Sequence, residues 1–315
     1  MIVRWSLDEL PAALADAGIE RPFLIASPRW QRLDLPRIDS WSEVPSDRIQ
    51  VPREADGILA VGGGSAIDMG KLASAQSGKP VVHVPTTYSG AEWTTFYGVR
   101  SPDRIIRGGG AGARPVAIVY DVGLTLDLPA DVTAGTALNG LAHCAEALYV
   151  RGHGSEGDEA ALRGAELISV ALPRVLADLG DRAAREELLR GAAHAGRALG
   201  LNGLALAHAM AQALGGTYGL PHGAMNALCL PPALEFNSRF VPDEVARFGA
   251  AVGGDAIERP RELARLGGFD RLRDFGVPEE DLAAVAAATS QRAGNQANPR
   301  PASPVEILAL FRRIY

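Results

Sequence analysis

The sequence predicts two parts of different class: an α/β domain with a doubly wound, mainly parallel dinucleotide-binding sheet, followed by an all-helical domain. Three observations predict this. Before residue 130, short apolar runs alternate with helix-like runs, and a run of glycines joins one such strand to a helix. After residue 130, strand patterns stop and long alanine- and leucine-rich segments with a helical period follow. We therefore expect an α/β domain over 1–130 and a helical domain over 131–315.

Four short apolar runs of the first half are each bounded by Gly, Pro or a polar turn, which is typical of strands buried on both faces. They are Phe23–Ser27, Gly57–Val61, Val81–Val84 and Val116–Tyr120. Helices are expected between them over Leu7–Ala17 and Ala66–Gln76. Strands and helices in alternation indicate a parallel sheet with helices on its faces.

The second half consists of segments whose apolar residues recur at about 3.6 positions, the period of an α-helix. The longer ones are Asp131–Val150, Asp158–Leu179, Arg182–Gly200 and Leu204–Leu214. Shorter helices are expected over Pro232–Asn237, Asp243–Val252, Pro260–Gly267 and Glu279–Thr289. The cleft between a sheet domain and a helical domain is the default place for a ligand.

Composition excludes several classes of protein. The chain has 315 residues, 47% of them hydrophobic and 22% charged, which is enough apolar material for a buried core. Its net charge of −6 and dispersed basic residues argue against a nucleic-acid partner. No apolar stretch reaches the roughly 20 residues of a membrane span, and the N-terminus lacks a signal-peptide pattern. With only Cys144 and Cys229, no disulfide framework is expected, and a cytoplasmic location is the simplest.

A glycine turn carries the clearest chemical signal. Gly62, Gly63, Gly64 and Ser65 lie between a predicted strand and a predicted helix. Consecutive glycines let the backbone approach an anion closely, and the first N–H groups of the helix then donate to a phosphate. Two helix residues complete this predicted cofactor site, the acidic one in the first turn and the basic one within reach of a phosphate or ribose: Asp68 and Lys71. A plain connecting turn is the alternative.

A second polar turn follows the next strand, where ligands sit in open α/β sheets. Pro85, Thr86, Thr87 and Ser89 belong to it, and their hydroxyls suit a diphosphate or a nicotinamide carboxamide. The first predicted strand ends in Ser27, with Arg29 shortly after it and Arg32 close by. Because no carboxylate stands there and guanidinium groups attract a 2′-phosphate, we expect NADP(H) to be accepted at least as well as NAD(H).

Three of the six histidines lie in polar interruptions of the helical half. His143 follows Asn139 by one helical turn, Gln212 follows His208 in the same way, and His222 lies in a turn. A lone histidine in an apolar helix is usually a satisfied core residue, but three of them favour one shared cleft. His83, His153 and His194 have no comparable setting and are expected to be structural or exposed.

These segments together resemble the iron-containing alcohol dehydrogenase superfamily, which includes dehydroquinate synthase-like relatives. The motifs are Gly62–Lys71, Pro85–Thr87, Thr136–Tyr149 and Leu220–Gly223. Within the superfamily the chain looks most like maleylacetate reductase, on the segments Thr86–Thr94, Tyr120–Pro129, Leu214–His222 and Asn298–Pro301. The resemblance runs from about Pro22 to the C-terminus. It implies a dehydroquinate synthase-like fold, a homodimer and an active site between the two domains.

The resemblance also implies site residues. Metal-dependent members bind a divalent ion with one aspartate and three histidines, which correspond by position to Asn139, His143, His208 and His222. Because an amide replaces the anionic ligand here, we expect catalysis without a metal. If a metal such as Fe or Zn binds after all, the three histidines are its ligands.

Three departures from the family pattern follow from the same alignment of motifs. Gln212 stands where members commonly have another histidine near the nicotinamide. Gly223–Asn226 replaces the polar and charged residues that follow the Pro–His step in typical maleylacetate reductases. The stretch between Ser27 and Gly57 is short for the family's strand–helix unit, so we expect one sheet element to be missing.

The resulting hypothesis is hydride transfer from NAD(P)H to a carbonyl, imine or conjugated enone. His143, His208 and His222 are the candidate proton donors, and Asn139 is a neutral hydrogen-bond donor. Five further side chains are candidates for the substrate wall: Tyr88, Trp93, Tyr149, Gln212 and Tyr218. Core packing is the alternative for the aromatic ones. The rival functions are a metal-dependent alcohol dehydrogenase and a catalytically silent nucleotide-binding protein.

Overall fold

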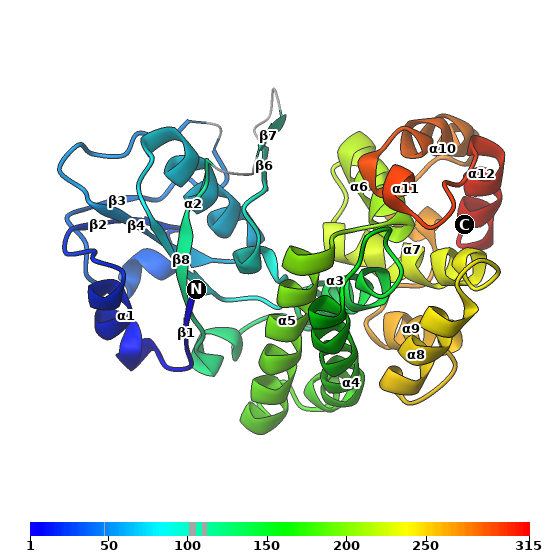
Figure 1. Ribbon diagram of the computed structural model, residues 1–315, viewed down its shortest axis with the longest axis horizontal. Helices are drawn as coiled ribbons and strands as arrows, with labels where there is room; N and C mark the ends of the chain where they lie inside the picture. The colour runs from blue at the N-terminus through cyan, green and yellow to red at the C-terminus, as the bar shows by residue number, and fades with distance from the viewer. Residues whose placement is uncertain (47, 101–104, 109–111) are drawn as a thin grey trace. The chain divides into compact units, whose positions relative to one another are not determined.

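The computed structural model describes residues 1–46, 48–100, 105–108 and 112–315. The chain divides into two compact units (Figure 1). The first comprises Met1–Thr87 and Ala91–Thr125, and the second comprises Tyr88–Gly90 and Leu126–Tyr315. A short segment, Tyr88–Gly90, thus belongs by its contacts to the second unit, although the residues on both sides of it belong to the first.

The first unit is built on a six-stranded parallel sheet in the order β1-β8-β5-β4-β2-β3. Its strands are β1 (Ile2–Arg4), β2 (Pro22–Ala26), β3 (Asp39–Trp41), β4 (Gly57–Gly62), β5 (Val81–Pro85) and β8 (Pro115–Val119). The four predicted strands are confirmed as β2, β4, β5 and β8, within a residue or so at each end. The two edge strands were not predicted because three residues are too few to show an apolar pattern.

Helices cover both faces of this sheet, as a doubly wound fold requires. Alternate strand residues point to opposite faces: Leu24 and Leu59 join the core under α1 (Leu10–Asp16), whereas Ile25 and Ile58 join the core under α2 (Gly64–Ser77). The predicted helix over Leu7–Ala17 begins as a 3₁₀ turn, η1 (Leu7–Glu9). Strands β2, β4 and β5 are buried along their whole length, which is why, apart from His83, their residues are apolar.

The expected loss of a sheet element is wrong. Strand β3 is present and pairs with β2, but only a 3₁₀ turn, η2 (Trp30–Arg32), lies between them. The short connection therefore removes the usual helix and keeps the strand. Beyond β5 the chain forms a 3₁₀ turn, η3 (Ala91–Trp93), and an unpredicted antiparallel hairpin of β6 (Tyr97–Arg100) and β7 (Ile105–Gly108). A further turn, η4 (Val122–Thr125), follows β8.

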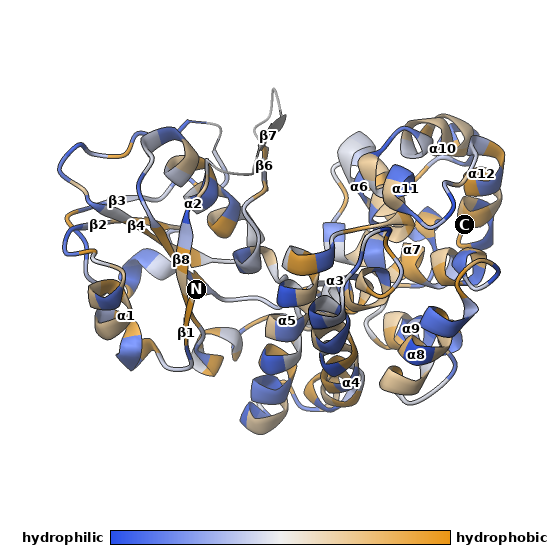
Figure 2. Ribbon diagram, viewed as in Figure 1, coloured by the Kyte–Doolittle hydropathy of each residue, from blue (hydrophilic) through white to orange (hydrophobic). Residues whose placement is uncertain are grey.

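The second unit is helical throughout its described residues. Its α-helices are α3 (Ala130–Ala147), α4 (Ser155–Ala177), α5 (Arg182–Asn202), α6 (Leu206–Tyr218), α7 (His222–Asn237), α8 (Pro242–Val252), α9 (Glu258–Leu266), α10 (Leu282–Ser290), α11 (Ala293–Ala297) and α12 (Pro304–Arg313), with 3₁₀ turns η5 (Leu272–Phe275) and η6 (Glu279–Asp281). In Figure 2, hydrophilic and hydrophobic residues alternate along α4 and α5, as expected of helices that bury one face. None of the helices in the described parts is long and apolar enough to cross a bilayer.

The start of α7 differs from the prediction. A helix beginning at Pro232 was expected, because proline favours the first turn of a helix. In the structure α7 begins ten residues earlier, at His222, and Pro231 and Pro232 lie inside it. Nearly all of its later residues are buried, so packing on every side holds the helix together despite the backbone hydrogen bonds that the prolines lack. His222 is therefore a first-turn helix residue and not a loop residue. Helices α11 and α12 were not predicted.

Candidate active site

The glycine turn of the first unit joins β4 to α2, and no side chain caps the N-terminus of that helix. Gly62 has a positive φ of +149°, and Gly63 caps α2 with no side chain of its own. A Cβ on Gly62 would come within 2.8 Å of the Cβ of Ala66, and one on Gly63 within 3.0 Å of Thr87 Cγ2. The positive φ and the 2.8 Å contact thus require glycine at position 62, and the first N–H groups of α2, at Gly64 and Ser65, can donate to an anion.

The other predicted cofactor residues of the first unit collect at the same sheet edge. Strands β2, β4 and β5 are parallel neighbours, so Ser27, Gly62 and Thr86 follow adjacent carboxyl ends. The N–H of Thr86 donates to the carbonyl of Gly62 over 3.0 Å. The hydroxyl of Thr87 is buried and has no hydrogen-bond partner among the described residues. A cradle that only glycine can line, with an unpaired hydroxyl beside it, fits the pyrophosphate of a dinucleotide.

Lys71 has internal partners in place of the predicted phosphate or ribose, and Asp68 is one of them. The Lys71 ammonium is buried and donates to the carbonyls of Ala91 and Phe96, at 2.9 and 2.7 Å, and to Thr94. It also pairs with Asp68 over 2.8 Å. Asp68 in turn accepts from the N–H of Gly98. Since these internal partners occupy the ammonium group, Lys71 holds the chain after η3 against α2 and is not available to a phosphate.

Ser89 also has a place different from the predicted one. Tyr88–Gly90, which we call the strap, lies on the helices of the second unit. The N–H of Tyr88 donates to Thr136 Oγ1, and the carbonyl of Ser89 accepts from Asn139 Nδ2 over 3.0 Å. Gly90 has a φ of +76°, and a Cβ on it would lie 2.8 Å from the Cα of Gly196 and 3.4 Å from His143 Nδ1. The backbone of Ser89 therefore joins the histidine cluster, while its buried hydroxyl has no hydrogen-bond partner among the described residues.

The three predicted histidines do come together. The rings of His143 and His208 are stacked with centroids 4.7 Å apart, and the His208 and His222 rings are 5.8 Å apart. They come from α3, α6 and α7, three helices far apart in sequence. Two buried imidazole nitrogens have no hydrogen-bond partner in the described part of the chain, namely His143 Nδ1 and His208 Nε2. Buried polar atoms without partners are uncommon, so these two mark a place for a polar ligand.

A buried carboxylate orients one of these rings. Glu146 Oε2 lies 2.6 Å from His208 Nδ1, and Glu146 also accepts from the backbone N–H groups of Ala205 and His208. Neither side chain of the pair is more than 1% exposed. The carboxylate requires the hydrogen of His208 to be on Nδ1, which directs the unpaired Nε2 into the cluster. A carboxylate placed behind an imidazole in this way stabilises the ring when both of its nitrogens carry hydrogen.

Two amides complete the cluster. Asn226 Nδ2 lies 2.7 Å from Asn139 Oδ1 and 3.0 Å from His222 Nε2. Asn139 Nδ2 lies 3.4 Å from His143 Nε2. Burial, together with the neighbouring rings of His208 and His222, lowers the pKa of His143 well below its usual range. The His143 ring is thus uncharged at neutral pH.

The donor set of the cluster differs from the aspartate and three histidines of metal-dependent members. A metal site needs lone pairs directed at one point, and an anionic ligand strengthens the binding of a divalent ion. Here Asn139 replaces the carboxylate, and the Nε2 atoms of His143 and His222 face amide nitrogens. No group of three His, Cys, Asp or Glu side chains in the described ranges is placed to hold a metal ion. The donor set is that of a hydrogen-bonded polar site.

The predicted substrate-wall residues scatter through the two units. Tyr88 and Tyr149 are buried in the helical core, where the Tyr88 hydroxyl contacts Arg185. Trp93 belongs to the first unit and donates to Tyr120, and the Tyr218 hydroxyl donates to Asp281 near the surface. These contacts are structural, and a role of the aromatic residues in a substrate wall stays a prediction. Gln212 lies one turn after His208 and is partly buried.

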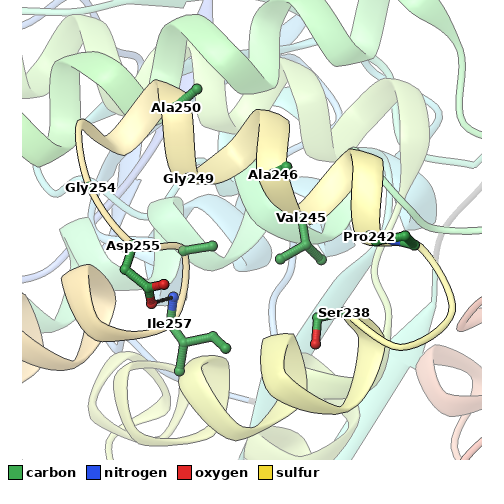
Figure 3. Close-up of a pocket in the computed structure, with 10 residues that line it drawn as sticks. Ser238, Pro242, Val245, Ala246, Gly249, Ala250, Gly254, Asp255 and Ile257 are labelled. Atoms are coloured by element: carbon green, nitrogen blue, oxygen red, sulfur yellow. Dashed lines mark hydrogen bonds between the residues drawn. The ribbon is translucent and has the colours of Figure 1, made fainter.

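A separate cavity of about 350 Å³ lies among the ends of α7, α8 and the start of α9 (Figure 3). Its lining is mostly aliphatic. The one titratable side chain in that lining, Asp255, accepts from the N–H groups of Ile257 and Glu258, and these bonds lower its pKa. Because that carboxylate is committed to the start of α9, the cavity offers no group for catalysis.

Sequence reasoning missed Glu146 and Asn226. A signal for Glu146 was present, since Asn139, His143 and Glu146 follow each other at four and three residues and so share one face of α3. An ionisable residue in so apolar a helix needs a partner. Asn226 follows His222 by one turn, but this spacing became meaningful only once α7 was known to begin at His222.

The fold and these groups define a class: nicotinamide-dependent oxidoreductases that join a dinucleotide-binding sheet to a helical domain. Comparison with known proteins gives the family. The model of the iron-containing alcohol dehydrogenase family matches residues 49–122, and that of the C-terminal part of the Fe-containing alcohol dehydrogenase family matches residues 133–315. The chain belongs to the iron-containing alcohol dehydrogenase family, and it is an NAD(P)-dependent oxidoreductase.

Within the family the chain is similar to maleylacetate reductases. It is 32% identical to that of Pseudomonas knackmussii strain B13, over 98% of this chain and 93% of the relative. It is 36% identical to that of Rhizobium sp. strain MTP-10005, over 83% and 74% respectively. The crystal structure of the Rhizobium enzyme is similar with a TM-score of 0.89 and 29% identity, covering 100% of this chain and 95% of that one.

Proposed function

We propose that this protein is a maleylacetate reductase-like, metal-independent reductase that transfers hydride from NAD(P)H to a carbonyl or conjugated enone, or to an imine. The carrying observation is the buried pair of Glu146 and His208, whose Nε2 has no partner among the described residues. The relatives named maleylacetate reductase support the substrate class. The replacement of the anionic metal ligand by Asn139 supports catalysis without a metal.

The nicotinamide, when bound, supplies the hydride. As hydride adds to the substrate carbon, the electron pair of the polarised double bond moves to the substrate oxygen. Because the resting His208 ring carries its hydrogen on Nδ1, Nε2 would first take up a proton from solvent and then give it to that oxygen, and Glu146 offsets the charge of the ring while it holds both protons. The neutral His143 ring adds a hydrogen bond through its unpaired nitrogen. For an imine, the nitrogen takes the place of the oxygen.

Single substitutions of His143, His208 and His222 by alanine test the assignment. We expect kcat to fall by roughly 100-fold or more for His208→Ala, because a positioned proton donor contributes about that much. Cofactor binding, measured by fluorescence titration, should be unchanged in the same variants, since the glycine turn lies in the other unit. Wild-type turnover in all three variants would refute the proposed site.

For the cofactor we propose that NADPH is accepted at least as well as NADH. Ser27 and Arg29 follow β2 directly, and Arg29 lies over the Trp30 ring at 4.6 Å. A guanidinium at this position attracts an anion such as a 2′-phosphate. The test is a comparison of the two dissociation constants, and a clear preference for NADH contradicts the proposal. We also propose that the protein is a cytoplasmic homodimer. Light scattering on the purified protein would test the number of subunits.

A further inference from the structure

The amide orientation of Asn139 is decided by a backbone atom. The carbonyl oxygen of Ser89 lies 3.0 Å from one end of the Asn139 amide. A carbonyl oxygen can only accept a hydrogen bond, so the facing atom must be the NH₂ group. The opposite end of the same amide, Oδ1, is then directed at Asn226.

The orientation passes on to Asn226. Its amide approaches Asn139 Oδ1 at 2.7 Å, a distance at which two oxygens would repel each other. The NH₂ group of Asn226 must therefore face Asn139. That nitrogen has two hydrogens, and the second one points to His222 Nε2 at 3.0 Å. Asn226 Oδ1 is left buried, with no partner among the residues the structure describes.

The two histidines at the ends of this chain of contacts are fixed in the same way. His222 Nε2 receives an N–H from Asn226, and His143 Nε2 faces the second N–H of Asn139 at 3.4 Å. A nitrogen that accepts a hydrogen bond carries no hydrogen. Each neutral ring must then carry its hydrogen on Nδ1.

The backbone brings the two amides to this distance. A Cβ on Gly223 would lie 2.3 Å from the carbonyl oxygen of Gly135, so α3 and α7 approach as closely as glycine allows. Asn139 lies one turn after Gly135, and Asn226 three residues after Gly223. The close crossing therefore sets the spacing of the amide pair.

We propose that Asn226 is a positioning residue, and that Ser89, Asn139 and Asn226 form an amide relay that fixes the tautomers of His143 and His222. Both rings then carry their hydrogen on Nδ1 and none on Nε2. The inference rests on the proposed function only in that the His143 donor serves a substrate oxygen. For His143 the donor is the buried Nδ1 atom that lacks a partner and lies beside the strap.

Nuclear magnetic resonance of protein labelled with ¹⁵N in its histidine rings tests this without substrate. In long-range ¹H–¹⁵N spectra at neutral pH we expect His143 and His222, assigned by single substitution, to show the Nδ1–H form. In Asn226→Asp the carboxylate can only accept, so His222 should leave that form while His208 keeps it. Met225→Leu is the matched control, because it changes a buried neighbour in α7 without touching the relay, and its ring signals should equal those of the wild type.

Wild-type rings in the Nε2–H form, or a His222 signal that Asn226→Asp leaves unchanged, would overturn the relay. If the aspartate variant does not fold, Asn226→Ala replaces it. That variant removes the donor, and His222 should then exchange between its two tautomers. A wild-type protein that shows the expected tautomers but reduces no carbonyl, imine or enone contradicts the proposed function and leaves the relay standing.

Discussion

Each unit of the molecule buries a histidine and a glutamate, and the two clusters behave in opposite ways. In the first unit, Glu92 Oε1 accepts from the Tyr120 hydroxyl over 2.7 Å, and His83 Nδ1 contacts the carbonyl of Glu92. Burial raises the pKa of Glu92 and lowers the pKa of His83 to about 3. In the second unit, Glu146 faces the ring of His208 directly and accepts two backbone N–H groups as well.

The comparison shows which contacts make a buried histidine and glutamate suitable for proton transfer. Glu92 and His83 contact the Tyr120 hydroxyl and a backbone carbonyl, and burial favours the uncharged form of each more strongly than the nearby Lys71 ammonium changes it for Glu92. Glu146 has N–H donors for both of its oxygens, and its imidazole partner keeps a free nitrogen for a ligand. The same two residue types are therefore structural in one unit and suited to proton transfer in the other.

The largest expected effect is on catalysis. Glu146→Gln removes the negative charge behind His208 while it keeps the size of the side chain. We expect kcat to fall by roughly 100-fold, because the ring loses the partner that stabilises it during proton transfer. The control is Glu92→Gln in the first unit, for which we expect kcat within about twofold of the wild type. Equal losses of steady-state kcat in both variants would contradict the claim that only the cluster of the second unit takes part in catalysis.

A smaller effect concerns stability at low pH. The pKa of His83 is lower in the folded protein than the unfolded value of 6.5. Between pH 6.5 and about 3 the unfolded chain therefore binds the extra proton, and stability falls as the pH falls. From pH 7 to pH 5 this residue should cost about 2 kcal/mol of the free energy of unfolding. In urea unfolding, the free energy of unfolding of His83→Gln should fall less between pH 7 and pH 5 than that of the wild type. An equal fall with pH in both proteins would contradict this prediction.

The smallest effect is expected for Tyr120→Phe. The Tyr120 hydroxyl accepts from Trp93 Nε1 and donates to Glu92, both at 2.7 Å. Its removal leaves those two groups without this partner and should cost roughly 1–2 kcal/mol of stability. The melting temperature should drop while kcat stays at the wild-type level. A substantial fall in kcat would mean that the first cluster also takes part in the chemistry.

Much of the fold could be predicted because it depends on local pattern. Strands buried on both faces are apolar throughout, and the glycine turn at Gly62 and Gly63 follows from a steric need that no other residue meets. The elements that were missed have no such pattern. Strand β3 is three residues long, and the start of α7 was hidden because its prolines lie inside the helix.

The candidate site was predicted only as a set of residue types. The sequence indicated that His143, His208 and His222 share a cleft, and the packing of α3, α6 and α7 brings their rings together. The hydrogen bonds of the Lys71 ammonium group could not be predicted, because its acceptors include backbone carbonyls that come close only in the folded loop. The same holds for Ser89, whose strap crosses to the second unit.

By itself the sequence determined the fold class, the glycine turn and the residue types of the site, since each depends on neighbours within a few positions along the chain. Only the tertiary structure decided which atoms meet. The pairing of Glu146 with His208 joins residues 62 positions apart, and the contact of Asn226 with Asn139 joins residues 87 positions apart. Proton positions depend on such contacts, because a hydrogen bond is set by distances between atoms and not by distance along the chain.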